Sequence, residues 1–165
     1  MPTPKFLAQL REKVGHELIL LPTVVVIARD SAGRLLMVHD KDSGAWTLPG
    51  GIMEPDEAPA DAAVREVFEE TGMQARLTRI VGVIGGRGCE TTYANGDRIA
   101  WVATVFAAML GNESPTADGV ETVDAKLFMP HELQSLDIRA DSLRFLSAEQ
   151  MHGIAAYFEP PERWG

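Results

Sequence analysis

The chain has 165 residues, of which 45% are hydrophobic and 24% charged, and its formal net charge at pH 7 is −9. This length and composition predict a single domain, residues 1–165, whose core is large enough to fold without disulfides or a structural metal. The excess of acidic side chains excludes the basic surface that duplex nucleic acids and anionic membranes attract, so we expect neither as a partner.

No segment of the sequence predicts export or a membrane span. The first residues, MPTPKFLAQLREKVG, lack the apolar stretch of a signal peptide, and the longest apolar run, LILLPTVVVIA at 18–28, is too short to cross a bilayer. Cys89 has no second cysteine with which to form an internal disulfide. These features predict a cytoplasmic protein, because the cytoplasm keeps thiols reduced.

The first half of the chain predicts a helix, a hairpin and a second helix. Apolar residues recur at helical spacing in KFLAQLREKV, which predicts an N-terminal helix at 4–14, a structural addition to the domain. Apolar and β-branched residues on both sides of DSAGR predict a hairpin at about 22–39. GAWTLPGG then breaks regular structure, and helical periodicity returns between Pro59 and Thr71, where Gly72 ends it.

The second half predicts further strands and two helices. Strands are expected at 75–85, on both sides of an Asn95–Gly96 turn, and at 125–129. PHELQSL predicts a short helix, and a C-terminal amphipathic helix is expected at about 143–157. Because helices flank the run of strands, we predict an α/β fold in which helices sandwich a central mixed β-sheet.

The helix at 59–71 has an apolar face and an acidic face. The acidic face carries Glu66, Glu69 and Glu70 within about one turn, beside Arg65. Carboxylates this close raise one another's pKa unless hydrogen bonds or a cation stabilise their ionised forms. A hard divalent cation meets that need through oxygen ligands, whereas the alternative is a solvated face on a surface helix.

The spacing around these glutamates resembles the Nudix box. Gly51 is followed after five residues by Glu57, and after seven more by REVFEETGM at 65–73, so all fixed positions of the pattern are present. The preceding LPGG and the order of predicted elements are similar to a whole Nudix domain, which implies an α/β/α sandwich with the box at 51–73. Ala58 departs from related boxes, which often place Ser or Thr there as a helix cap that is worth about 1 kcal/mol.

The resemblance implies a Nudix pyrophosphohydrolase of the MutT-like kind. Its reaction would be hydrolysis of the diphosphate linkage of a nucleoside diphosphate derivative, such as a nucleoside triphosphate or an ADP-ribose-like molecule, by metal-activated water. Mg²⁺ is the implied cofactor, with Mn²⁺ as a substitute. The implied partner is therefore a small-molecule nucleotide, and the family's frequent dimers leave a homodimer open.

Each matched box residue takes an implied role. Arg65 would orient its neighbouring carboxylates, while Glu57 and Gly72 would be structural positions that brace the loop and end the helix. The resemblance implies four oxygen donors for the cation: the carboxylates of Glu66, Glu69 and Glu70 and the carbonyl of Gly51.

The general base stays open among three carboxylates. Glu66 is the first candidate, because the family sometimes uses a box glutamate. Glu121 and Asp124 lie in GVETVDAKLF, ahead of the strand at 125–129, where Nudix domains often place an additional acidic residue. We rank Glu121 above Asp124.

Aromatic residues outside the box are candidates for substrate contact. Tyr93, Trp101 and Phe128 could stack on a base, although aromatic residues in strands pack in the core by default. Two other classes of protein remain as alternatives: a non-catalytic Nudix-like nucleotide-binding or regulatory module, and a prenyl-diphosphate isomerase on the same fold. Cys89 is the feature that favours the isomerase.

Overall fold

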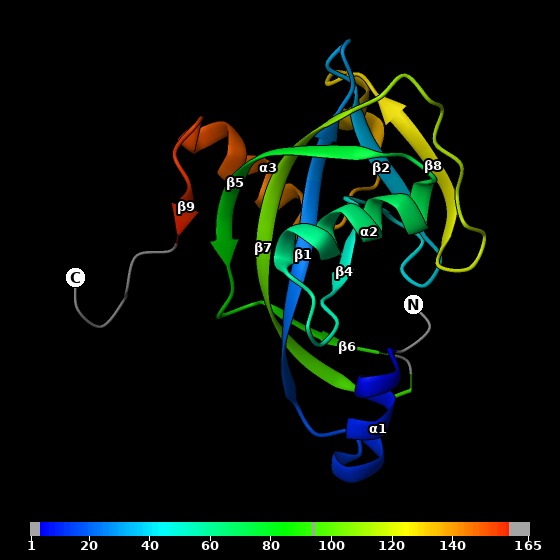
Figure 1. Ribbon diagram of the computed structural model, residues 1–165, viewed down its shortest axis with the longest axis vertical. Helices are drawn as coiled ribbons and strands as arrows, with labels where there is room; N and C mark the ends of the chain where they lie inside the picture. The colour runs from blue at the N-terminus through cyan, green and yellow to red at the C-terminus, as the bar shows by residue number, and fades with distance from the viewer. Residues whose placement is uncertain (1–3, 94, 159–165) are drawn as a thin grey trace.

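The centre of the structure is a parallel pair of long strands, β1 (Ile19–Arg29) and β7 (Arg98–Leu110) (Figure 1). The computed structural model describes residues 4–93 and 95–158. In β1, Val24 and Val26 are fully buried on one face of the sheet, whereas Ile27 belongs to the core cluster on the other face. β-branched residues on both faces are typical of a central strand that is covered on two sides.

Other strands extend this pair on both sides. β2 (Leu35–Asp40) follows β1 as its antiparallel hairpin partner, and β5 (Ala75–Ile84) lies antiparallel to β7. β8 (Thr122–Phe128) pairs with β2, and β9 (Tyr157–Phe158) pairs in parallel with β5. Within the described residues the sheet follows the path β3-β2-β1-β7-β5-β9 and is mixed.

Three short strands complete the sheet: β3 (Trp46–Thr47), β4 (Gly50–Ile52) and β6 (Glu90–Thr92), which pair with β2, β1 and β7 respectively. The predicted break in regular structure at GAWTLPGG is therefore wrong, because this segment carries β3 and β4. Gly50 lacks a side chain, which lets β4 run close along the backbone of β1.

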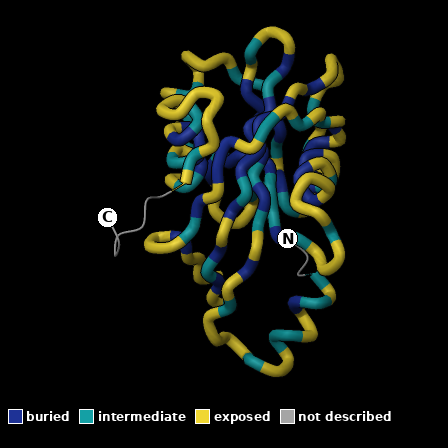
Figure 2. The backbone as a smooth tube through the Cα atoms, turned by 60° about the vertical axis from the view of Figure 1, so that its left-hand side comes forward, coloured by how far each residue is buried: buried dark blue, intermediate teal, exposed yellow. Residues whose placement is uncertain are grey.

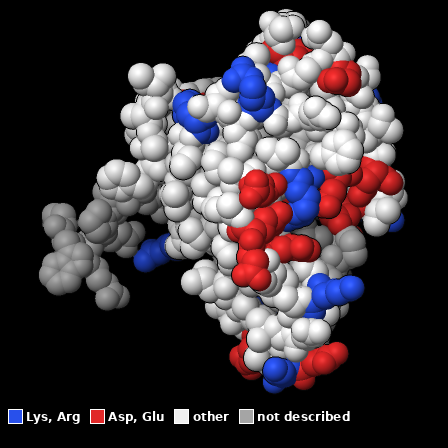
Figure 3. Space-filling model, viewed as in Figure 1, with Lys and Arg blue, Asp and Glu red and all other residues white. Residues whose placement is uncertain are grey.

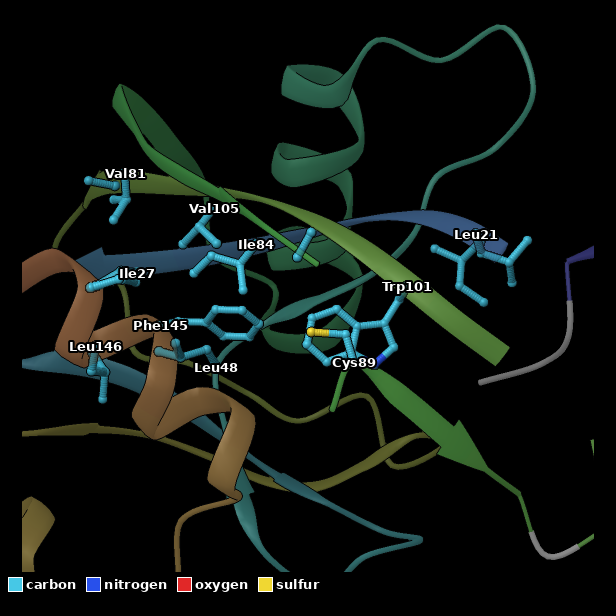
Figure 4. Close-up of a cluster of buried hydrophobic side chains, with 14 of the residues drawn as sticks. Leu21, Ile27, Leu48, Val81, Ile84, Cys89, Trp101, Val105, Phe145 and Leu146 are labelled. Carbon is cyan, nitrogen blue, oxygen red and sulfur yellow. The ribbon is translucent and has the colours of Figure 1, made fainter. Parts of the chain in front are cut away.

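Two helices cover opposite faces of the sheet. α2 (Pro59–Thr71) packs on a cluster that includes Val24, and α3 (Ala140–His152) packs on a cluster that includes Ile27. Figure 4 shows Phe145 of α3 reaching into the second cluster. The predicted α/β sandwich with a central mixed sheet is thereby confirmed.

The C-terminal elements differ from the prediction at their boundaries. α3 begins before the expected 143–157 and ends at His152, because the next residue, Gly153, has a positive φ of 57° that interrupts helical geometry. PHELQSL forms a single 3₁₀ turn, η1 (Glu132–Ser135), because Leu136 is already extended.

Helix α1 (Lys5–Val14) forms at one end of the sheet, and its Leu7 is 6% exposed and joins the core cluster under α3. Figure 2 shows that buried residues concentrate in the central strands and exposed residues in the loops. Within residues 4–93 and 95–158, the helices are too short or too polar to cross a membrane.

Local backbone features determine where α2 begins and ends. Pro59 occupies its first turn, where a missing N–H costs nothing, but Ala58 at the N-cap supplies no side-chain hydrogen bond. At the other end Gly72 adopts the left-handed conformation at φ 68°, and its N–H donates to the Phe68 carbonyl at 2.8 Å.

Gly50 is required by its close contact with β1. A Cβ atom built on it would lie 2.2 Å from the Val24 carbonyl oxygen and 2.9 Å from Val25 Cα. Its N–H donates to Glu70 Oε2 at 3.1 Å, so the same residue links β1, β4 and α2.

We expect Ala58→Ser to raise the free energy of unfolding by about 0.5–1 kcal/mol, because the serine hydroxyl can accept a free N–H in the first turn of α2. Chemical denaturation measures this change. Ala60→Ser, an exposed position inside the same turn, is the matched control. A gain equal for both variants would contradict capping as the cause.

We expect Gly50→Ala to lower the free energy of unfolding by about 1–3 kcal/mol, because the new methyl group overlaps the Val24 carbonyl. Gly33→Ala is the control, since Gly33 also has a positive φ but an added Cβ atom there would meet nothing within 4 Å. The excess loss for Gly50→Ala over Gly33→Ala in thermal or denaturant unfolding measures the backbone overlap. Equal losses of unfolding free energy in the two variants would show that the backbone shifts and removes the overlap.

Candidate active site

Arg65 is the centre of a hydrogen-bonded group on the outer side of α2. Its Nε and Nη2 donate to the two oxygens of Glu57 at 2.7 and 2.9 Å, and its Nη1 donates to Glu66 Oε1 at 2.9 Å and Glu69 Oε2 at 3.0 Å. Nη2 also reaches the Ile52 carbonyl at 3.3 Å. Figure 3 shows acidic side chains gathered around a basic one over α2.

Glu57 joins the loop before α2 to the helix. Besides binding Arg65 with both oxygens, it accepts the N–H of Glu54 at 3.0 Å. The Arg65 guanidinium holds the pKa of Glu57 below its ordinary value, against the opposing effect of burial, and the pKa of Arg65 is raised in return, first by Glu57. Two parallel hydrogen bonds between one guanidinium and one carboxylate fix the orientation of Arg65.

Two of the box carboxylates are buried. Glu66 is 3% exposed, and burial raises its pKa to about 7, although the charge of Arg65 acts in the opposite direction. Glu70 is 8% exposed, and burial together with the charge of Glu66 raises its pKa well above the ordinary value, while the Gly50 N–H opposes this. Glu69 differs, because its side chain is 57% exposed. A positive charge beside Glu66 and Glu70 would stabilise their ionised forms.

The donor chemistry of this group fits a hard divalent cation. Glu66, Glu69 and Glu70 provide carboxylate oxygens, and burial of two of them disfavours uncompensated negative charge. Within the part of the chain that the structure describes, no three His, Cys, Asp or Glu side chains already converge as a metal site. Glu66 and Glu69 instead turn towards Arg65, and Glu70 turns towards the Gly50 N–H.

Glu121 and Asp124, the two candidate carboxylates that follow the box in the sequence, lie in different surroundings. Glu121 lines the same cavity as Glu70, and burial raises its pKa. Its loop is held by Asp118 Oδ1, which accepts the N–H groups of Val120, Glu121 and Thr122 at 3.0–3.1 Å. Asp124 instead lies on β8, where it accepts the N–H of Ala125 and pairs with Lys126. The structure therefore brings Glu121, and not Asp124, to the cavity.

A cavity of about 690 Å³ opens beside the box. Gly50, Gly51 and Glu70 line it on the box side. Tyr93 and Trp101, from the β6–β7 region, line it elsewhere. This volume is typical of pockets for small molecules and cofactors.

The three candidate aromatic residues have different positions. Tyr93 is 41% exposed in the cavity, whereas Trp101 is 8% exposed and also packs against Phe145, with ring centroids 5.8 Å apart. Phe128 lies outside the cavity lining, because its ring packs edge-on against Trp46 at 4.8 Å. The structure thus brings two of the three to the site.

The cavity also contains residues that sequence reasoning missed. Arg11 reaches it from α1, and Arg139 reaches it from the start of α3, where its Nε donates to Asp141 Oδ1 at 2.8 Å. Ser142 forms a buried hydroxyl pair with Thr47 at 2.9 Å. These residues come from segments far apart in the chain and have no motif, so no local pattern could have identified them.

Comparisons with known proteins show which family this sequence resembles. Residues 20–148 match the family model of the NUDIX domain. A MutT-like protein of Streptomyces ambofaciens is 37% identical over 78 residues, 47% of this chain and 50% of that protein. A putative 8-oxo-dGTP diphosphatase of Bacillus subtilis is 33% identical over 108 residues, 66% of each chain. The matched segments thus span half to two thirds of these curated relatives.

The fold is shared with solved structures. The NUDIX domain of Shewanella oneidensis NrtR, solved in complex with ADP ribose, superposes with a TM-score of 0.67 at 17% identity and covers 92% of this chain and 98% of its own. Similarity at this level concerns the fold alone. Since the family model covers most of the sequence, the chain belongs to the NUDIX domain family.

Proposed function

We propose that this protein hydrolyses the diphosphate linkage of a nucleoside diphosphate derivative with Mg²⁺ as its cofactor. The observation that carries the proposal is the pair of buried carboxylates, Glu66 and Glu70, because Glu70 lines a cavity large enough for a nucleotide. Arg65 faces Glu66 and the neutral Gly50 N–H faces Glu70, so a cation beside the pair would stabilise the negative charge that burial disfavours.

Each box residue has a proposed part in the reaction. Glu66, Glu69, Glu70 and the Gly51 carbonyl hold the cation. The chemistry that Mg²⁺ supplies when bound is neutralisation of diphosphate charge and acidification of a water molecule. Arg65 is fixed by its two hydrogen bonds to Glu57. It would keep Glu66 and Glu69 in place as these carboxylates exchange Arg65 for the cation.

The general base of the proposed reaction is Glu66 or Glu121, which accepts the proton of the attacking water. The place of Glu121 in the cavity lining supports it over Asp124, whose oxygens are occupied on β8. We retain Glu66 as the first candidate.

The proposed substrates are nucleoside triphosphates or ADP-ribose-like molecules. The Bacillus relative is named as a putative 8-oxo-dGTP diphosphatase, and the Shewanella domain binds ADP ribose, which supports both. The isomerase alternative loses its supporting residue, because Cys89 is fully buried in the core beside Trp101 (Figure 4). The remaining alternative to the proposed hydrolase is a non-catalytic binding module, which an activity assay must exclude.

We expect the wild type to turn over members of a nucleoside diphosphate panel with Mg²⁺ and not with excess EDTA. Glu69→Gln should lose on the order of 10²-fold or more in kcat, because a ligand charge is removed. Glu12→Gln, on the exposed side of α1, is the charge-matched control. Binding of nucleotides without turnover by folded wild type would identify a non-catalytic module instead.

We expect Glu57→Gln to lower the free energy of unfolding at pH 7 by about 1–3 kcal/mol, because it weakens the fork with Arg65. The pKa of Glu57 is lowered in the folded state, so its stabilisation is complete above the ordinary value of 4.5 and is lost as pH falls through the folded-state value. The difference between wild type and Glu57→Gln, followed by denaturation from pH 7 to pH 3, should therefore shrink below pH 4.5. Glu54→Gln is the neighbouring control, and a difference that does not change with pH would contradict the pairing.

A further inference from the structure

We propose that Arg11 is a positioning residue that holds α1 as a wall of the substrate cavity, and that this wall sets the affinity for the group attached to the diphosphate. The inference rests on the proposed function and adds to it a determinant of substrate binding outside the box.

Helix α1 is outside the matched family domain, which begins at residue 20. It is nevertheless part of the cavity, because Pro4, Leu7 and Arg11 line it. Leu7 is 6% exposed and packs in the core cluster, so the helix is docked on the domain. In Figure 1, α1 lies below α2, with β6 between them. A helix that sequence patterns predict as a structural addition is therefore also a boundary of the site.

Arg11 adds polar contacts to this apolar docking. Arg11 Nη1 donates to the carbonyls of Gly15 and Glu17 at 3.0 and 2.6 Å, and Nη2 donates to the carbonyl of Arg98 at 2.7 Å. Its Nε lies 3.6 Å from Asp97 Oδ1, and the side chain is 11% exposed. Arg11 thus joins the end of α1 to the segment before β1 and to the start of β7.

These acceptors suit a guanidinium and not an ammonium. They belong to three different residues, and the planar fork of an arginine presents several fixed donors to them at once. A lysine would retain the charge but has a single nitrogen at the end of a flexible chain. Loss of the fork should therefore release α1 even where the positive charge is kept.

The α1 wall and the box residues line separate parts of the cavity. Gly51 and Glu70 line the box side, whereas Arg11 and Asp97 belong to the α1 side. A diphosphate bound at the box would direct its attached group into the remaining volume, towards α1. Displacing α1 changes binding of that group and leaves the box carboxylates in place. An effect of this kind appears in KM and not in kcat.

The test uses ADP-ribose and dGTP as substrates with wild type, Arg11→Gln, Arg11→Lys and Lys13→Gln. We expect Arg11→Gln to raise KM at least tenfold with kcat within about twofold of wild type. Lys13→Gln removes the same charge from the exposed side of α1 and should leave both constants unchanged. Arg11→Lys should resemble Arg11→Gln, and wild-type KM in Arg11→Lys would overturn the positioning role, because charge alone would then suffice.

Hydrogen exchange gives a readout independent of turnover. Amides of α1 should exchange faster in Arg11→Gln than in Lys13→Gln, while those of α2 stay protected. If Arg11→Gln does not fold, Arg11→Lys decides the question: a KM raised at least tenfold supports the inference, and a wild-type KM overturns it. Wild type that hydrolyses neither substrate nor any other member of the panel overturns the proposed function, whereas active wild type with unchanged KM in Arg11→Gln overturns this inference alone.

Discussion

The burial of Glu66 and Glu70 between α2 and the sheet is the constraint on which the site depends. Carboxylates out of water are unfavourable unless donors or cations surround them. The chain supplies Arg65 on one side and the Gly50 N–H on the other. The Gly50 donor in turn requires β4 to lie against β1 at a distance that no larger residue allows. The sheet, the loop and the helix are therefore fitted to one another around two acidic side chains.

Arg65 makes two kinds of hydrogen bond with the acidic group and its surroundings. Its bonds to Glu57 and the Ile52 carbonyl are structural, whereas its bonds to Glu66 and Glu69 use oxygens that a cation would need. Because Glu57 binds two of its donors, the guanidinium has a fixed place beside Glu66 and Glu69. The helix thus holds its acidic face together with an internal counter-ion.

The sequence predicts the local part of this molecule well and the long-range part poorly. The limits of α2 follow from Pro59 and Gly72, which act within a turn of the chain, and the box follows from fixed spacing. Tyr93 follows β6, which pairs with β7, and lines the cavity, whereas Phe128 lies outside it on β8, which pairs with β2. Aromatic residues look alike in sequence, so only strand pairing separates a cavity wall from a core contact.

The anchor of α1 has a consequence for how related chains would vary. All three hydrogen bonds of Arg11 end on main-chain carbonyls, and every residue type carries a carbonyl. The residues at 15, 17 and 98 can therefore change during evolution without losing the anchor. Hydrogen bonds of this kind leave no correlated partner in the sequence, so a contact analysis based on paired substitutions would detect Arg11 only through its ion pair with Asp97.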